Sequence, residues 1–183
     1  MAKEEYKKDI CRVFLAGIIV LLAGAYFGGK DSKSSGTESF SYRPDEVAAA
    51  ADTLAPREAM LLGLIMVESQ GRTRAVSSAG ARGILQIMPV YVDEANRICR
   101  IEGRETTFTF DDAFDERKSV EMFMIVSGRH CGTGDDPETI AKTIRRHNPK
   151  AGEWYSQRVF RAMETVQSNP AERQKYRRFL EYL

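Results

Sequence analysis

Prolines and capping residues divide the chain beyond residue 43 into segments of helical length. Proline is favoured at the first position of a helix because its missing N–H would have no partner there, and Asp or Asn just before a helix can cap the free backbone donors. Such starts stand at Pro44, Pro56, Pro89, Asp115, Asp136–Pro137 and Asn169–Pro170. Only Arg104 to Phe110, RETTFTF, alternates in the β manner, and it could form a short strand or an irregular loop. The sequence therefore predicts an all-α domain.

The composition bounds the class of protein and its partners. A chain of 183 residues with 43% hydrophobic residues can bury one core and is short for two. Its 27 basic and 26 acidic residues are mixed along the chain and leave a net charge of +1, which gives no support to a nucleic-acid partner. Cys11, Cys99 and Cys131 lack the paired spacing of a zinc site. We expect one domain with appendages, and neither a metal nor a cofactor.

An uncharged apolar run, VFLAGIIVLLAGAYF, extends from Val13 to Phe27 behind a segment that contains four basic residues. This order favours a cytoplasmic N-terminus and export of the chain beyond the run. The run is slightly short for a membrane span of about 20 residues, and Ala23-Gly24-Ala25 is a small-residue pattern of the type that signal peptidases cut after. A retained anchor and a cleaved signal peptide both remain open.

The segment from Gly28 to Arg43 is rich in Gly and Ser and suits a flexible tether. The predicted organisation is therefore an export segment at 1–27, a linker at 28–43 and a folded domain at 44–183. We expect the protein to be anchored in the cytoplasmic membrane facing the periplasm or cell wall, or secreted after cleavage. In an oxidising compartment Cys99 and Cys131 would either pair or stay buried.

Glu68 ends an apolar helical segment. Nearly every residue from Met60 to Val67 is apolar, so this helix should be buried on most sides. Leu61, Leu64 and Ile65 precede Glu68 by seven, four and three residues, which places its carboxyl group on an apolar face. Loss of hydration there favours the protonated form that a general acid requires. A lone glutamate in such a place is more often an exposed helix-end residue, because buried acids are rare, so the next segment is needed to decide.

The segment from Ser77 to Pro89, SSAGARGILQIMP, joins small residues to an apolar run that Gln86 interrupts. Glycines let the backbone approach a ligand closely, and Gln86 supplies both a donor and an acceptor that suit a sugar amide. Together with Glu68-Ser69, this string resembles the signature of the soluble lytic transglycosylase family: a Glu-Ser pair, a spacer, then Ser-x-x-Gly-Ala-x-Gly-Leu-Met-Gln-x-Met-Pro. The matching residues are Ser77, Gly80, Ala81, Gly83, Gln86, Met88 and Pro89. A looser resemblance extends from about Pro44 to Val166.

This resemblance implies a fold, a substrate and site residues. The fold would be lysozyme-like, with two helical lobes around a groove, and residues 44–183 would be the catalytic domain acting on peptidoglycan glycan strands. Glu68 would be the catalytic acid and base. Ser77 and Gln86 would line the saccharide groove with Met88 packing near it, and Ser69 would be structural.

The segment from Ile144 to Met163, IRRHNPKAGEWYSQRVFRAM, resembles the family's third motif, in which an Ala-Tyr-Asn-Ala-Gly string precedes a helix that carries a Tyr. Asn148 matches the Asn of that string, whereas His147 stands where its Tyr usually is. The Tyr that positions the general acid is therefore unassigned, and Tyr155 could take this role from the following helix. His147 could line the site, or it could belong to an exposed basic patch.

The family's reaction needs only one carboxyl group. As the resemblance implies, the acid protonates the oxygen between the muramic and glucosamine sugars, the substrate's N-acetyl group stabilises the cation, and the same glutamate deprotonates the C6 hydroxyl to close a 1,6-anhydro ring. A lysozyme-type hydrolase would need a second carboxylate, which Asp111 or Asp112 could provide. A non-catalytic wall-binding module of a secretion, conjugation or phage assembly is a third reading, although a pure binder has no need of a desolvated carboxyl group. An envelope-spanning, conjugation or phage machinery remains an open partner.

Overall fold

The structure is a computed structural model that describes residues 53–183. The helices are α3 (Pro56–Glu68), α4 (Pro89–Ile101), α5 (Glu116–Cys131), α6 (Pro137–His147), α7 (Glu153–Ser168) and α8 (Pro170–Tyr176), with 3-10 helices η1 (Phe110–Phe114) and η2 (Arg177–Tyr182). The predicted export segment, the linker and the helix start at Pro44 lie outside the described residues. Within residues 53–183 no helix is long and apolar enough to cross a membrane.

The predicted helix starts inside the described region are confirmed. Proline occupies the first turn of α3, α4, α6 and α8. Asp115 caps α5 by accepting a hydrogen bond from the Lys118 N–H, and Asp136 caps α6 through the Thr139 N–H. Asn169 caps α8 in the same way. Each cap satisfies a backbone donor that the first helical turn leaves free, and the mostly helical fold follows from these starts.

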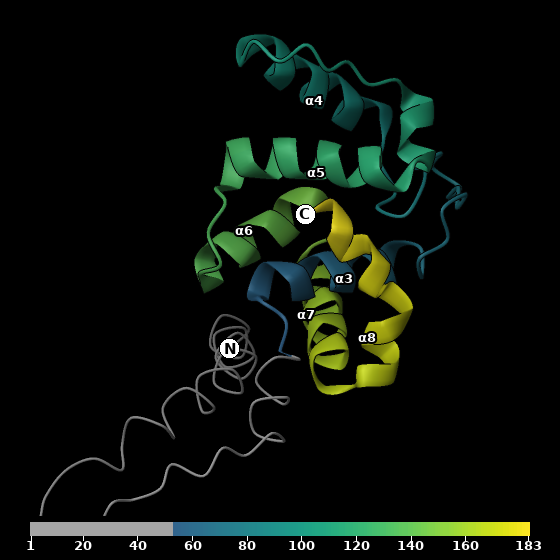
Figure 1. Cartoon of the computed structure of the whole chain (residues 1–183), viewed down its shortest axis with the longest axis vertical. Helices are drawn as coiled ribbons and strands as arrows, with labels where there is room; N and C mark the ends of the chain where they lie inside the picture. The colour runs from purple at the N-terminus through teal and green to yellow at the C-terminus, as the bar shows by residue number, and fades with distance from the viewer. Residues whose placement is uncertain (1–52) are drawn as a thin grey trace, which may run out of the picture. The chain divides into compact units, whose positions relative to one another are not determined.

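Helix α3 forms the centre of the core and packs chiefly against α7 (Figure 1). Its residues from Met60 to Ile65 are buried. Gly63 lets the two helices approach closely, because a Cβ atom there would lie 2.9 Å from Met163 Cγ and 3.2 Å from the Val159 carbonyl oxygen. This close packing fixes α7 against the helix that ends in Glu68.

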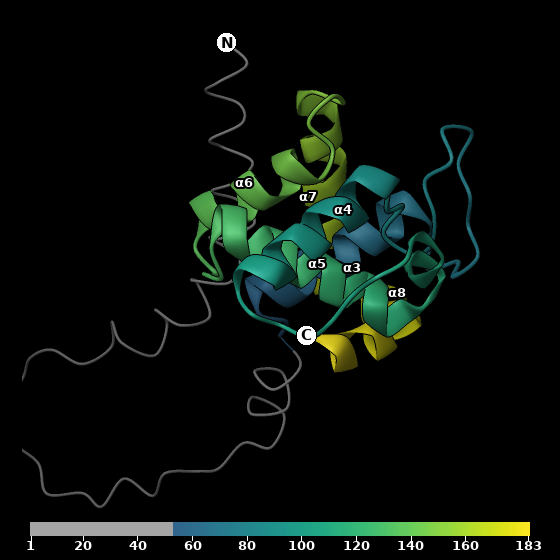
Figure 2. The same cartoon turned by 90° about the horizontal axis from the view of Figure 1, so that it is seen from above.

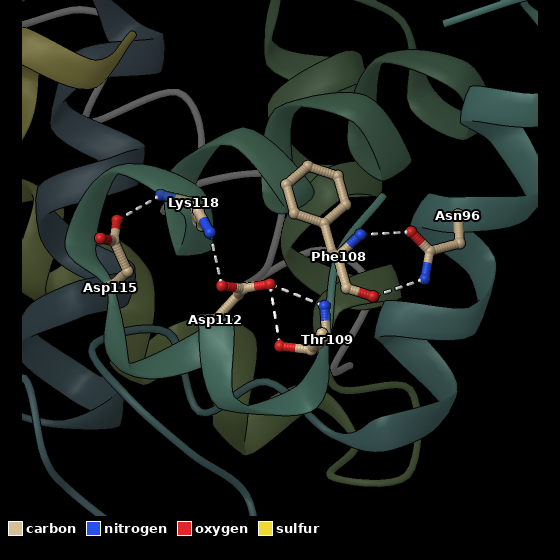
Figure 3. Close-up of polar contacts among 6 residues, drawn as sticks. All are labelled: Asn96, Phe108, Thr109, Asp112, Asp115 and Lys118. Carbon is tan, nitrogen blue, oxygen red and sulfur yellow. Dashed lines mark hydrogen bonds and ion pairs between the residues drawn. The ribbon is translucent and has the colours of Figure 1, made fainter. Parts of the chain in front are cut away.

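Helices α4 and α5 lie side by side in both views (Figures 1 and 2). Between α4 and η1, residues 104–109 form an irregular loop and no strand, and Phe110 begins η1. The Asn96 side chain explains this, because it accepts a hydrogen bond from the Phe108 N–H and donates one to the Phe108 carbonyl, both at 2.8 Å (Figure 3). A side chain thus satisfies the backbone groups that a partner strand would otherwise bind.

The loop from Ser77 to Pro89 folds back on itself and rests on η1. Isolated bridges join Val76 to Arg82 and Arg82 to Ile87. At Gly83, where φ is +74°, a Cβ atom would lie 1.7 Å from the Ala113 carbonyl oxygen. Only glycine fits this position, because both the positive φ and the contact with η1 exclude a side chain.

Candidate active site

The end of α3 is fastened to the loop that comes after it. Ser69, the residue after Glu68, is 1% exposed. Its hydroxyl donates to the Ile84 carbonyl at 2.8 Å and accepts from the Gly71 N–H at 3.1 Å. These bonds fix the backbone beside the Glu68 carboxyl group, in keeping with the structural role expected for Ser69.

Tyr155 reaches Glu68 from the first turn of α7. Its hydroxyl donates a hydrogen bond to Glu68 Oε1. The Tyr155 residue is 3% exposed and the Glu68 side chain 14% exposed. Burial raises the pKa of Tyr155 well above its ordinary value, and the nearby Glu68 carboxylate raises it further. Tyr155 therefore stays a neutral donor that orients one carboxyl oxygen of Glu68.

His147, the last residue of α6, lies on another side of the same carboxyl group. Its Nε2 is 3.7 Å from Glu68 Oε1 and 3.1 Å from the Leu85 carbonyl oxygen. The side chain is 5% exposed, and the rings of Tyr91 and Phe123 meet it edge-on at centroid distances of 5.9 and 5.6 Å. The alternative of an exposed basic patch is therefore wrong for His147.

Burial lowers the pKa of His147, and this effect outweighs the Glu68 carboxylate and the Leu85 carbonyl, which both favour the charged ring. The ring is therefore neutral near pH 7, with its proton on Nε2 so that it can donate to Leu85. The other nitrogen, Nδ1, is buried and has no hydrogen-bond partner within residues 53–183, which agrees with that tautomer. His147 thus ties the loop at Leu85 to the end of α6 beside the carboxyl group.

The polar residues predicted in the loop bind the loop itself. The Ser77 hydroxyl accepts from the Ala81 N–H at 3.0 Å. Gln86, at φ +50°, donates from Nε2 to the Gly83 carbonyl at 3.0 Å. Met88 is 36% exposed and directly precedes α4. These contacts shape the loop, and the groove-lining role of the three residues stays a prediction.

Asn148 directly follows α6 and is half-buried. Its backbone carbonyl accepts a hydrogen bond from the Ala151 N–H at 3.2 Å, which closes the turn between α6 and α7. This turn sets the spacing between His147 and Tyr155, so that both side chains reach Glu68. A substrate contact by the Asn148 side chain stays a prediction.

The two candidates for a second acid are engaged elsewhere. Asp111 has a side chain that is 86% exposed and forms an ion pair with Arg82 at 2.6 Å. Asp112 accepts hydrogen bonds from Thr109 and from Lys118 Nζ (Figure 3). Burial raises the pKa of Asp112, but these donors outweigh it and hold the pKa below its usual value. Neither carboxylate contacts Glu68 in the part of the chain that the structure describes.

The remaining candidates for site chemistry are metal-ligating side chains and the cysteines. Within residues 53–183 no group of three or more His, Cys, Asp or Glu side chains could hold a metal ion. Cys99 and Cys131 are both buried and free, so of the two expectations for them burial is the one observed. Cys11 lies outside the described residues.

Sequence reasoning missed part of this site. Tyr91 and Phe123 pack on the His147 ring, yet each occupies an ordinary apolar position of its helix, so no local signal marks it. Leu85 acts through its backbone carbonyl, which any residue type would offer. The positive φ at Gln86 had no glycine to signal it.

Comparison with known proteins supports the resemblance seen in the sequence. The family model described as the transglycosylase SLT domain matches residues 46–122. The match includes Glu68 and the Ser77–Pro89 loop but ends before His147 and Tyr155. No curated protein and no solved structure matches the chain. Residues 46–122, with the Glu-Ser pair and the glycine-rich loop in the family's order, are therefore similar to the transglycosylase SLT domain.

Proposed function

We propose that the protein is a peptidoglycan lytic transglycosylase. It cleaves the β-1,4 bond between N-acetylmuramic acid and N-acetylglucosamine and leaves a 1,6-anhydro end on the muramic sugar. The observation that carries this proposal is the hydrogen bond from the buried Tyr155 hydroxyl to Glu68, in a chain whose SLT domain implies a peptidoglycan substrate. On the same family grounds the described helices are part of a lysozyme-like, two-lobed scaffold.

In this mechanism Glu68 acts twice. Its proton passes to the glycosidic oxygen as the bond from the muramic C1 atom breaks, and the substrate's N-acetyl group stabilises the positive charge. The resulting carboxylate then takes the proton of the C6 hydroxyl while the C6 oxygen bonds to C1. Tyr155 holds the carboxyl oxygen in place through both steps, and such positioning is worth a large part of a catalytic barrier.

The rival reactions have less support. A retaining or inverting hydrolase needs a second carboxylate about 5 to 9.5 Å from the first, and Asp111 and Asp112 are committed to Arg82, Thr109 and Lys118. A wall-binding module would gain nothing from a glutamate that a buried tyrosine orients. The single glutamate favours attack by the substrate's own hydroxyl.

The test is Glu68→Gln. The amide keeps the shape of the side chain and can still accept the Tyr155 hydrogen bond, so the protein should fold normally. The amide has no acidic proton to transfer, and loss of a general acid typically costs about 10²- to 10⁴-fold in rate. Turbidity clearance of purified sacculi measures this, and a variant that retains more than about a tenth of the wild-type rate would show that Glu68 is not the acid.

We also propose that the protein is exported and held at the cytoplasmic membrane by the apolar run from Val13 to Phe27. The full chain should then sediment with membranes, whereas a chain that begins at Ser41 should be soluble and active. N-terminal sequencing can contradict this proposal, because a mature protein that starts at Tyr26 would mean that the run is a cleaved signal.

A further inference from the structure

A cleft of about 500 Å³ opens beside the last turn of α3, outside the contacts that surround Glu68. Its lining residues come mainly from α3, α7 and α8, and these three helices pack on one another (Figure 1). The residues that matter for its chemistry are Met66 and Val67 from α3, Arg158 and Arg161 from α7, and Glu172 and Lys175 from α8. The cleft is therefore part apolar and part charged.

The charge of this cleft is positive. Lys175 is paired with Glu172, at 2.6 Å between Nζ and Oε1. Arg158 and Arg161 are both exposed, and neither guanidinium forms an ion pair with any residue in 53–183. Two cations therefore face the cleft without a counter-charge from the described part of the chain. A concave surface of one sign attracts anions of the other.

The cleft lies next to the reacting carboxyl group. Val67 directly precedes Glu68 in α3, and Arg158 follows Tyr155 by one helical turn in α7. At about 1.5 Å of rise per residue, Arg158 and Arg161 lie roughly 4.5 and 9 Å along the α7 axis from Tyr155. The positive charge of Arg158 also acts on Tyr155: burial raises the pKa of that hydroxyl, and Arg158 opposes the rise.

We propose that this cleft binds the anionic peptide stem of the muramic sugar that is cleaved at Glu68. The inference rests on the proposed function. The stem is joined to the muramic sugar itself, so it begins at the reaction centre, and it carries free carboxylates on its D-glutamate and C-terminal residues. Four extended residues span about 13 Å, enough to pass both arginines. Guanidinium groups bind carboxylates through paired hydrogen bonds.

Binding in a Glu68→Gln background tests the proposal without turnover. The full-length protein is mixed with three preparations of glycan strands: strands with intact stems, strands whose stem carboxylates have been coupled to methylamine, and strands freed of stems by an amidase. Retention on each is measured by co-sedimentation at low salt, where exposed charge pairs act most strongly.

The parent protein should bind intact strands more tightly than the other two. Adding Arg158→Gln and Arg161→Gln should weaken binding to intact strands by about three- to tenfold, the range expected for one or two exposed charge pairs, and should remove the preference. The matched control is Arg117→Gln with Lys142→Gln, which removes the same charge from exposed positions on α5 and α6. This control should keep the preference.

Two results would overturn the proposal. Equal binding of intact and methylamine-coupled strands by the parent would show that stem carboxylates are not recognised. An equal loss on all three preparations in the arginine variant would show that Arg158 and Arg161 serve the glycan groove or the fold instead. The proposed function is judged separately, by whether protein with Glu68 intact cleaves any of the three preparations.

Discussion

Replacing Tyr155 by phenylalanine isolates the contact on which the site depends. Phenylalanine keeps the buried ring and removes only the hydroxyl that donates to Glu68 Oε1. No other donor in residues 53–183 can take its place, because His147 Nε2 is 3.7 Å from the same oxygen and donates to Leu85. The Glu68 carboxyl group would stay at the end of α3 but lose the hydrogen bond that orients it.

The magnitude depends on the kind of bond that is lost. A hydrogen bond to a charged group is worth about 1.5 to 3 kcal/mol, and about 1.4 kcal/mol corresponds to a tenfold change in rate. If the bond reaches this strength only as Glu68 becomes charged in the transition state, kcat/KM for sacculus digestion should fall by about 10- to 100-fold. The free energy of unfolding should change by no more than about 1 to 2 kcal/mol, since Glu68 is partly open to water.

Initial rates of turbidity loss and urea unfolding of the same preparations measure both quantities. Tyr182→Phe, in η2, is the matched control because the same hydroxyl is removed from a half-exposed position. A Tyr155→Phe protein that digests sacculi within twofold of the wild-type rate would refute the positioning role. A variant that loses activity only because it unfolds would be recognised by its unfolding curve.

Two further predictions concern stability. Gly83→Ala should lower the free energy of unfolding by more than about 2 kcal/mol, because its Cβ would lie 1.7 Å from the Ala113 carbonyl oxygen. The control Gly80→Ala is also at positive φ but has nothing within 4 Å of the added Cβ, so it should cost about 1 kcal/mol. Equal melting temperatures of the two variants would contradict the predicted difference. For His147, burial holds the pKa below 6.5, so below that pH the unfolded chain binds a proton that the folded chain does not. The free energy of unfolding then falls with falling pH by up to about 1.4 kcal/mol per pH unit. Urea unfolding at pH 7.5 and 5.5 should show a smaller fall for His147→Gln than for the wild-type protein. Equal falls in the two proteins would refute the role of His147.

The helices were predictable where local signals mark their ends. Proline or a capping side chain begins α3, α4, α5, α6 and α8, and these signals act within a few residues. Helix α7 begins after Gly152, which caps it with backbone at φ +70° and no side-chain bond, so its start was not marked. The alternation of Arg104 to Phe110 left a short strand and an irregular loop open, because the tertiary contact with Asn96 decides that segment.

The site was predictable to the extent that its residues are adjacent in sequence. Glu68 and its loop could be recognised by their resemblance to a family signature, and a family match covers them. The contact between Tyr155 and Glu68 joins residues 87 positions apart, and no periodicity reports such a distance. For His147 the sequence does not decide between a site residue and an exposed basic patch, because its burial depends on Tyr91 and Phe123, which come from two other helices.

The central claim concerns the product, and the mass of the released muropeptides tests it most directly. Closure by the muramic C6 hydroxyl should exceed attack by water, because the substrate delivers this hydroxyl at high effective concentration and the second acids are engaged elsewhere. Wild-type digests analysed by mass spectrometry should therefore contain 1,6-anhydro ends, lighter by one water (about 18 Da) than hydrolysis products and unchanged by borohydride. Reducible ends in their place would contradict the account and make Asp111 and Asp112 the first positions to replace.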